Sequence, residues 1–249
     1  MNGEMTVANP FGMRRIGIYG GTFAPPHNGH VAAARAFLSQ MRLDYLYVIP
    51  AFLPPHKRLD FIDDPADRLR MCELAFGGIE GVIVSDAEQR RGGKSYTVDT
   101  LRELSAPDTR LFLLCGTDMM LTLDTWHEAP EIFRLCYPIY IRRESDESLD
   151  RRIVAKVSEY KEKYNAVVRR VVTPPIEISS TEVRRAAAAG KPGHRRFRSR
   201  LLLLLRLLIP GRDGVLRVHR SYLFLLGLLL LIRGQRVGQH GGGQHADDH

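Results

Sequence analysis

The chain has 249 residues, which is enough for one large α/β domain or for one domain with an appendage. Its net charge of +8 lies entirely within residues 191–249, which contain 11 Lys and Arg against 3 Asp and Glu, so residues 1–190 carry no net charge. Because the excess basic charge is confined to this tail, the composition argues against a nucleic-acid-binding protein.

The cysteines and the first residues exclude further classes. Cys72, Cys115 and Cys136 are widely spaced and form no Cys-x-x-Cys pair, which argues against a structural zinc site and a disulfide framework. Each lies within an apolar run, where a single cysteine behaves as a small buried hydrophobe. Residues 1–13 lack the apolar segment of a signal peptide, so the sequence predicts a cytoplasmic protein.

The first predicted strand leads through a glycine-rich turn into a helix. Residues 15–19 predict the strand, and the Ala-rich segment that begins at Val31 predicts the helix. Gly20 and Gly21 have no Cβ, so a phosphate can approach the backbone N–H groups of the turn closely. The helix start adds unpaired N–H groups and the positive end of its dipole. This arrangement predicts an anion site at the carboxyl end of the strand.

Two histidines stand at the start of this helix. His27 and His30 are three residues apart, a spacing that places both imidazoles on one side of a helix. Together with the glycine pair they predict a cradle for a polyphosphate; the alternative is a sharp turn with surface histidines. The G-x-G-x-x-G spacing of a dinucleotide site is missing, which argues against a redox dehydrogenase.

The remainder of the first 190 residues alternates strand and helix patterns. In the helix predicted over residues 66–76, Leu69, Cys72 and Phe76 form an apolar stripe, and Asp67 and Arg68 are interpreted as charges at the helix start. The alternation predicts a Rossmann-like α/β fold, a mostly parallel sheet of about six strands with helices on both faces. Further strands are predicted over residues 44–50, 81–85, 110–115, 137–141 and 167–172, and helices from 95–100 through Leu104, over 149–164 and from Ile178.

Polar residues follow the ends of several predicted strands. Lys57 lies in a basic, turn-rich loop after the second strand, within reach of the phosphates that the first turn would bind. Asp118 follows Gly116 and the fourth strand at a helix start, where a carboxylate can bind ribose hydroxyls or cap the helix. Thr97 opens another helix and has the chemistry of a cap.

Two later stretches also have a structural explanation. Ser179 and Glu182 have the spacing of a capping box, which explains these two residues but not Arg184. Arg184 carries a fixed fork of donors that matches a phosphate. Trp126 is the only tryptophan, and a single tryptophan is usually a core or interface residue.

The motifs together resemble a known family. The pattern Gly-Gly-Thr-Phe-x-Pro-x-His-x-Gly-His at residues 20–30 resembles the signature of the nucleotidyltransferases with a His-x-Gly-His motif. The runs Ser-Tyr-Thr-x-Asp-Thr at 95–100 and Ile-Ser-Ser-Thr-x-x-Arg at 178–184 are most similar to those of bacterial nicotinate-nucleotide adenylyltransferases. The resemblance extends from about residue 15 to about residue 190. Ala24 departs from it, because the family usually has Asp or Asn there.

The resemblance implies that the protein transfers the adenylyl group of ATP to nicotinate mononucleotide, giving deamido-NAD and pyrophosphate in NAD biosynthesis. It implies Mg²⁺ carried in with ATP and no dedicated protein metal site. His127 would act mainly through its backbone. A homo-oligomer is compatible with the sequence. The site residues that the resemblance implies are His27, His30 and Arg184 for catalysis; Gly20, Gly21, Thr22, Phe23, Lys57, Gly116, Asp118, Ile178, Ser179, Ser180 and Thr181 for ATP; and Tyr96, Thr97, Trp126 and His127 for nicotinate mononucleotide.

Alternatives remain open at this point. A relative that adenylylates phosphopantetheine or uses CTP is the nearest, although the segment at 95–100 and Trp126 argue against it. The predicted division is an extension over residues 1–12, a nucleotidyltransferase domain over 13–190 and an atypical basic, Leu-rich tail over 191–249.

The tail bears on a second alternative. Its apolar stretches reach at most 11 residues, short of the roughly 18–20 that span a membrane. We interpret it first as a shifted reading frame, then as a basic segment lying on a membrane surface, then as a C-terminal module. If the tail is genuine, a non-catalytic nucleotide-binding or membrane-associated protein becomes the alternative.

Overall fold

The computed structural model describes residues 12–54, 64–142, 147–173 and 178–188. The predictions for Lys57, for residues 1–11 and for the tail over 191–249 lie outside these ranges. The chain divides into two compact units after Val183, and the sheet belongs to the first unit. In the ranges that the structure describes, no helix combines the length and the apolar character needed to cross a membrane.

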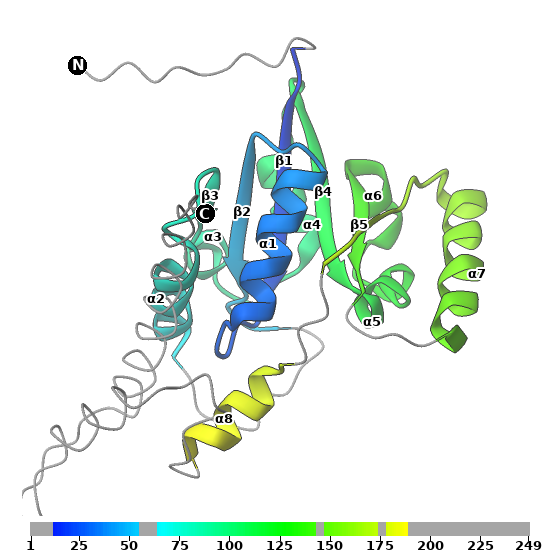
Figure 1. The fold of residues 1–249 in the computed structure, drawn as a ribbon. Helices are drawn as coiled ribbons and strands as arrows, with labels where there is room; N and C mark the ends of the chain where they lie inside the picture. The colour runs from blue at the N-terminus through cyan, green and yellow to red at the C-terminus, as the bar shows by residue number, and fades with distance from the viewer. Residues whose placement is uncertain (1–11, 55–63, 143–146, 174–177, 189–249) are drawn as a thin grey trace, which may run out of the picture. The chain divides into compact units, whose positions relative to one another are not determined.

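A six-stranded sheet confirms the predicted fold class, and each of its strand pairs is parallel. Figure 1 shows the sheet and the helices packed on it. Gly20 pairs with Ile49 and Gly21 with Pro50, so the glycine pair ends the first strand instead of forming the turn after it. The strands, in the spatial order β3-β2-β1-β4-β5-β6, are β1 (Arg14–Gly21), β2 (Tyr45–Pro50), β3 (Val82–Val84), β4 (Thr109–Gly116), β5 (Cys136–Ile141) and β6 (Arg169–Val171).

Helices cover both faces of the sheet. α1 lies over β1 and β2 on one face, and α4 and α6 pack against each other on the other face (Figure 1). The short helices α3 and α6 were not predicted, because five to seven residues carry too little periodicity to show a helix. The helices are α1 (Asn28–Gln40), α2 (Pro65–Phe76), α3 (Ala87–Arg91), α4 (Thr97–Leu104), α5 (Thr117–Met120), the 3₁₀ turn η1 (Leu123–Thr125), α6 (Ala129–Leu135), α7 (Glu147–Tyr164) and α8 (Ser180–Ala188).

Alternation along β1 divides the core between the two faces. Ile16 and Ile18 point into the cluster that α4, α6 and α7 cover. Gly17 points to the α1 side, where a Cβ would press on Leu43 and lie within 2.9 Å of Phe37. The close packing of α1 on β1 therefore depends on the missing side chain. All three cysteines are buried, as expected of small apolar side chains.

A buried polar cluster links α3 to α4. Glu88 on α3 is 7% exposed and accepts a hydrogen bond from the Thr100 hydroxyl on α4 (3.1 Å). Thr100 in turn accepts a hydrogen bond from the Arg91 guanidinium (2.8 Å). Burial raises the pKa of the Glu88 carboxyl, while hydrogen bonds with Ser95 and Thr100 and the charge of Arg91 act in the opposite direction.

A Cβ at Gly17 should destabilise the fold. Gly17→Ala would press on Leu43 and Phe37 in a packed interior, and overpacking of this kind costs about 1–3 kcal/mol. Urea denaturation measures the free energy of unfolding. Gly20→Ala is the matched control, because nothing lies within 4 Å of a Cβ at Gly20. Equal loss in the two variants would contradict the packing account.

The Glu88 cluster predicts a pH dependence of stability. The pKa of Glu88 is raised from its ordinary 4.5 in the folded state, so the folded protein holds this proton more tightly than the unfolded chain does. Stability should therefore fall as the pH rises from about 4.5 through the folded-state pKa. Glu88→Gln cannot titrate, and its free energy of unfolding should fall less than that of the wild type between about pH 5 and about pH 8.

Urea denaturation at both pH values checks this prediction. Glu80→Gln removes an exposed carboxyl and should follow the wild type. If Glu88→Gln showed the same pH dependence as the wild type, the buried carboxyl would not be the cause.

Candidate active site

The strand order reverses between β1 and β4. From β1 the chain moves outward to β2 and β3, and from β4 it moves outward in the other direction to β5 and β6. In open parallel sheets a ligand binds outside the carboxyl ends of the two strands at this point. Thr22 and Phe23 follow β1, and Thr117 and Asp118 follow β4. The topology therefore brings two of the predicted motifs to one edge of the sheet.

The two histidines lie together at the start of α1. Their ring centroids are 3.7 Å apart, and the Nδ1 atom of His30 accepts a hydrogen bond from the backbone N–H of His27 (3.1 Å). The neutral His30 ring therefore carries its proton on Nε2, which makes this atom a donor for an anion. A Cβ at Gly29 would lie 3.1 Å from the His27 ring, which explains the glycine between the histidines.

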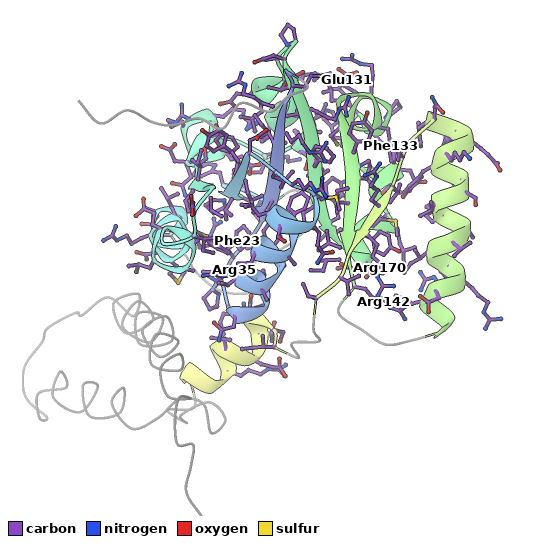
Figure 2. All side chains as sticks on the ribbon, turned by 45° about the horizontal axis from the view of Figure 1, so that its top comes forward. Phe23, Arg35, Glu131, Phe133, Arg142 and Arg170 are labelled. Atoms are coloured by element: carbon purple, nitrogen blue, oxygen red, sulfur yellow. The ribbon has the colours of Figure 1, made fainter. Side chains whose placement is uncertain are left out.

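The Phe23 ring packs against the His30 ring. Its ring is 3% exposed and makes edge-to-face contacts with His30 (5.1 Å between centroids) and with Phe76 of α2 (5.8 Å). Figure 2 shows Phe23 between α1 and α2. Its φ of 48° is unusual for a bulky residue, and such strain is concentrated at functional sites. Phe23 was predicted to bind ATP; its side chain is buried against His30, so the part of Phe23 left for that role is its backbone.

The two glycines that end β1 differ in role. A Cβ at Gly21 would lie 3.0 Å from the Phe23 ring, so this glycine is required by packing. Gly20 has open space where its Cβ would be. Of the pair, Gly20 is therefore the residue that leaves room for a ligand to approach the strand end.

The second motif contacts the first. The Ser180 hydroxyl donates a hydrogen bond to the carbonyl oxygen of Pro25 (2.9 Å), which lies 155 positions earlier in the chain. The Ile178 side chain approaches the Cα of Gly29, since it would lie 3.5 Å from a Cβ there. This contact brings the start of α8 to the turn that precedes α1. Thr181 is exposed beside it, and Arg184 lies on the same helix, four residues after Ser180.

The predicted capping box is confirmed. The backbone N–H of Ser179 donates to the Glu182 carboxylate (2.7 Å), and the N–H of Glu182 donates to the Ser179 hydroxyl (3.2 Å). The Ser179 hydroxyl also donates to Glu182 (2.7 Å). In this conformation Ser179 is engaged within its own helix, whereas Ser180 makes the contact with the first motif.

The carboxyl end of β4 presents Asp118. Gly116 is the N-cap of α5, so the alternative in which Asp118 caps this helix is wrong. Asp118 is the second residue of the helix and is exposed. Its Oδ1 atom would lie 2.7 Å from a Cβ at Gly116, so the Asp118 side chain lies over the strand end. Thr117 is buried and donates to the carbonyl oxygen of Ile141 (3.3 Å).

Tyr96 and His127 come together from different segments. Their ring centroids are 4.2 Å apart, so the His127 side chain contributes a contact as well as its backbone. Trp126 is half-buried and packs against the core cluster. Thr97 is the first residue of α4, whose N-cap is Tyr96 without a side-chain cap bond, so the capping interpretation of Thr97 is wrong.

A partly buried ion pair holds the segment before Trp126. Lys156 of α7 pairs with the Asp124 carboxylate (2.8 Å), and the Tyr160 hydroxyl lies 3.0 Å from the same carboxylate. Burial acts to raise the pKa of Asp124, but the bonds with Lys156 and Tyr160 outweigh it and the pKa is lowered. These contacts position the turn that carries Trp126 and His127.

Sequence reasoning missed Arg68. It was interpreted as a charge at the helix start, but its side chain is 1% exposed. Asp67 does lie in the first turn of α2, and Asp64 caps that helix. A signal was present, because Arg68 precedes Cys72 by four residues and Ala75 by seven and so shares their buried face.

Comparisons with known proteins agree with this arrangement. Residues 18–186 match the cytidylyltransferase-like family. A probable nicotinate-nucleotide adenylyltransferase of Synechococcus sp. (strain JA-3-3Ab) is 37% identical over 212 residues, which cover 84% of this chain and 95% of the relative. A protein of the same name from Gloeobacter violaceus is 37% identical over 181 residues, which cover 72% of this chain and 86% of the relative.

A solved structure shares the fold. The nicotinic acid mononucleotide adenylyltransferase of Plasmodium falciparum, complexed with NaAD, superposes with a TM-score of 0.53 at 19% identity, over 70% of this chain and 84% of that one. This likeness supports the fold, and the sequence relatives supply the family. The chain therefore belongs to the nicotinate-nucleotide adenylyltransferase family, within the cytidylyltransferase-like nucleotidyltransferases.

Proposed function

We propose that the protein transfers the adenylyl group of ATP to nicotinate mononucleotide, giving deamido-NAD and pyrophosphate in the cytoplasm. The observation that carries this proposal is the hydrogen bond from Ser180 to Pro25, which joins the two family motifs beside the point where the strand order reverses. The family relatives, named for this activity, support the choice of substrates.

The reaction needs no protein nucleophile. An oxygen of the mononucleotide 5′-phosphate attacks the α-phosphorus of ATP in line. The new P–O bond forms as the bond between the α-phosphorus and the bridging oxygen to the β-phosphate breaks, and pyrophosphate leaves with the electron pair. The protein's task is to position two anionic substrates and to stabilise the charge that develops on the phosphoryl oxygens.

The ATP phosphates would bind at the start of α1. His30 would offer its Nε2–H to the α- or β-phosphate, with His27 beside it, and the open space at Gly20 would admit the triphosphate next to Thr22. Asp118 is exposed at the end of β4, where it would bind ribose hydroxyls, with Gly116 leaving room for the nucleoside.

The leaving pyrophosphate would be held from the second motif and the loop after β2. We assign Arg184, Thr181 and Lys57 to this role, and Ser180 through its backbone N–H at the start of α8, because its hydroxyl donates to Pro25. Ser179 could join them only by exchanging its bond with Glu182 for one with a phosphate. Ile178 packs beside Gly29 and would shape the wall of the nucleotide site.

Nicotinate mononucleotide would bind beside Tyr96 and Thr97. The paired rings of Tyr96 and His127 and the half-buried Trp126 offer aromatic surfaces for the pyridine ring. Backbone N–H groups at Thr97 and His127 are the proposed donors to its carboxylate.

We propose that Mg²⁺ enters bound to the ATP phosphates. Within the described residues no three His, Cys, Asp or Glu side chains are grouped as a metal site. The ion would take most of its ligands from phosphate oxygens and water, as Mg²⁺ commonly does in nucleotide enzymes, and it would neutralise phosphate charge.

Substitutions at His30 should separate its two hydrogen bonds. Removing one transition-state donor costs about 10²- to 10³-fold in kcat, so His30→Ala should lose that much. His30→Gln places an amide donor near the position of Nε2 and should retain more activity. His30→Asn places its amide near Nδ1, keeps the bond from His27 at best, and should behave like His30→Ala. Pyrophosphate release from ATP measures all four proteins.

The acceptor is tested in the same assay. Nicotinate mononucleotide, nicotinamide mononucleotide and phosphopantetheine are supplied in parallel, and only the first should support rapid release. No turnover with any acceptor from wild-type protein that still binds ATP would overturn the proposed reaction. Equal activity of His30→Asn and His30→Gln would remove the Nε2 donor from the mechanism.

We further propose that residues 13–190 carry the activity and that the tail adds nothing to catalysis. A chain ending at residue 190 should keep kcat and KM within about 3-fold of the full chain, because the proposed site residues all precede that point. Pelleting with vesicles of anionic lipid, for both chains, tests the alternative of a membrane-surface tail. A truncated chain that folds but loses activity would show that the tail completes the enzyme.

A further inference from the structure

Arg68 has the largest of the fully buried side chains in the described part of the protein, at 1% exposure. Burying a guanidinium is costly unless its donors are satisfied. The helix that carries Arg68 also has a face exposed to water, so the burial of this charge requires a specific explanation. No role has been assigned to Arg68 in the site described above.

The guanidinium bonds to the carboxyl ends of two neighbouring strands. Nη1 donates to the carbonyl oxygen of Ala51 and to that of Thr22 (3.3 Å), and Nη2 donates to that of Phe52 (3.0 Å). Thr22 is the first residue after β1, and Ala51 and Phe52 follow β2 directly. One planar group thus holds the turn that leads to His30 at a set distance from the loop after β2.

The loop after β2 passes this constraint on to the acceptor side. The N–H of Phe52 donates to the Ser95 hydroxyl (2.8 Å), and the N–H of Ser95 donates to the carbonyl oxygen of Leu53 (2.9 Å). Ser95 immediately precedes Tyr96 and Thr97. A continuous series of hydrogen bonds therefore runs from Thr22, through Arg68 and Phe52, to the segment assigned to nicotinate mononucleotide.

We propose that Arg68 is a positioning residue for adenylyl transfer, which sets the spacing between the ATP half of the site and the mononucleotide half. The proposal rests on the proposed function, because the two halves are defined by its substrates. Arg68 touches neither substrate; it acts through the backbone at Thr22 and Phe52. In-line transfer depends on this spacing, and a misplacement of about 1 Å can cost about 100-fold in rate.

The geometry explains why the residue is arginine. The guanidinium has several donors in fixed directions and reaches the backbone at both strand ends at once. A lysine ammonium is a single compact charge and cannot hold both strand ends in place. Arg68→Lys keeps the charge and most of the stem, so each half-site should still form. The spacing between the two halves should be held less tightly, because the hydrogen bond from the Ala51 N–H to the Gly21 carbonyl oxygen (2.9 Å) would remain and the guanidinium link would not.

The test compares Arg68→Lys and Arg68→Met with Arg70→Lys and Arg70→Met in the full chain. Arg70 lies on the same helix and forms an exposed pair with Glu73, so its variants are matched controls. For folded Arg68→Lys, quantified by circular dichroism and urea denaturation, kcat for pyrophosphate release should fall about 10- to 100-fold, and KM for each substrate should change less than about 3-fold. The Arg70 variants should match the wild type.

A purely structural role predicts a different result. Arg68→Lys would then yield fewer folded molecules, and kcat per folded molecule would stay within about 3-fold of the wild type, which would overturn the proposal. A rise in KM for ATP with unchanged kcat would also overturn it, because Arg68 would then serve ATP binding alone. A wild-type protein without turnover would overturn the proposed function. The two results above are obtained with an active wild-type protein, so the two failures are distinguishable.

Ser95→Ala keeps the proposal testable if no Arg68 variant folds. It removes the acceptor of the Phe52 N–H and leaves α2 intact. We expect kcat to fall about 3- to 10-fold with little change in either KM. Where Arg68→Lys does fold, the double variant should lose less than the product of the two single losses. An unchanged kcat in Ser95→Ala would overturn the proposed link.

Discussion

The candidate site residues at the ends of β1 and β4 depend on the parallel pairing of these two strands. Parallel neighbours end at the same edge of a sheet, and the chain departs from this pair in opposite directions. Crossover connections that leave in opposite directions open a crevice outside the carboxyl ends of such a pair, which is the physical reason why ligands bind there. α1 and α5 begin at Asn28 and Thr117, directly after this edge, and the start of a helix carries the positive end of its dipole, so the backbone alone makes the region suitable for an anion.

The side chains around this edge mainly provide rigidity. His30 is oriented by the N–H of His27 and rests on the Phe23 ring, and Gly21 and Gly29 are small because the rings of Phe23 and His27 occupy the space beside them. A chemistry that relies on positioning and charge stabilisation needs its donors held in place before the substrates arrive. The buried guanidinium of Arg68 likewise holds the backbone after β1 and the backbone at the end of the neighbouring strand.

Several residues of the motifs therefore have structural roles that their residue types alone do not indicate. Ser179 and Glu182 complete the cap of α8, and Phe23 is a buried support, although the motif alone suggests ligand contacts for both stretches. Ser180 was one hydroxyl among three in its run, and only its bond to Pro25 distinguishes it. In the same way Tyr96 and His127 gave no sign in the sequence that their rings meet.

The amino-acid sequence by itself determined the order of the main strands and helices, the two histidines at the start of the helix after β1, the capping box and the family. These properties are local, because periodicity, turn chemistry and motif spacing can each be recognised within about 10 to 15 consecutive residues. Only the tertiary structure decided that the rings of Tyr96 and His127 meet, that Ser180 bonds Pro25 and that Arg68 is buried against two strand ends. Each of these contacts joins segments that are distant in the chain. The residue pattern of one segment does not indicate which carbonyl oxygen or ring of another segment will lie beside it.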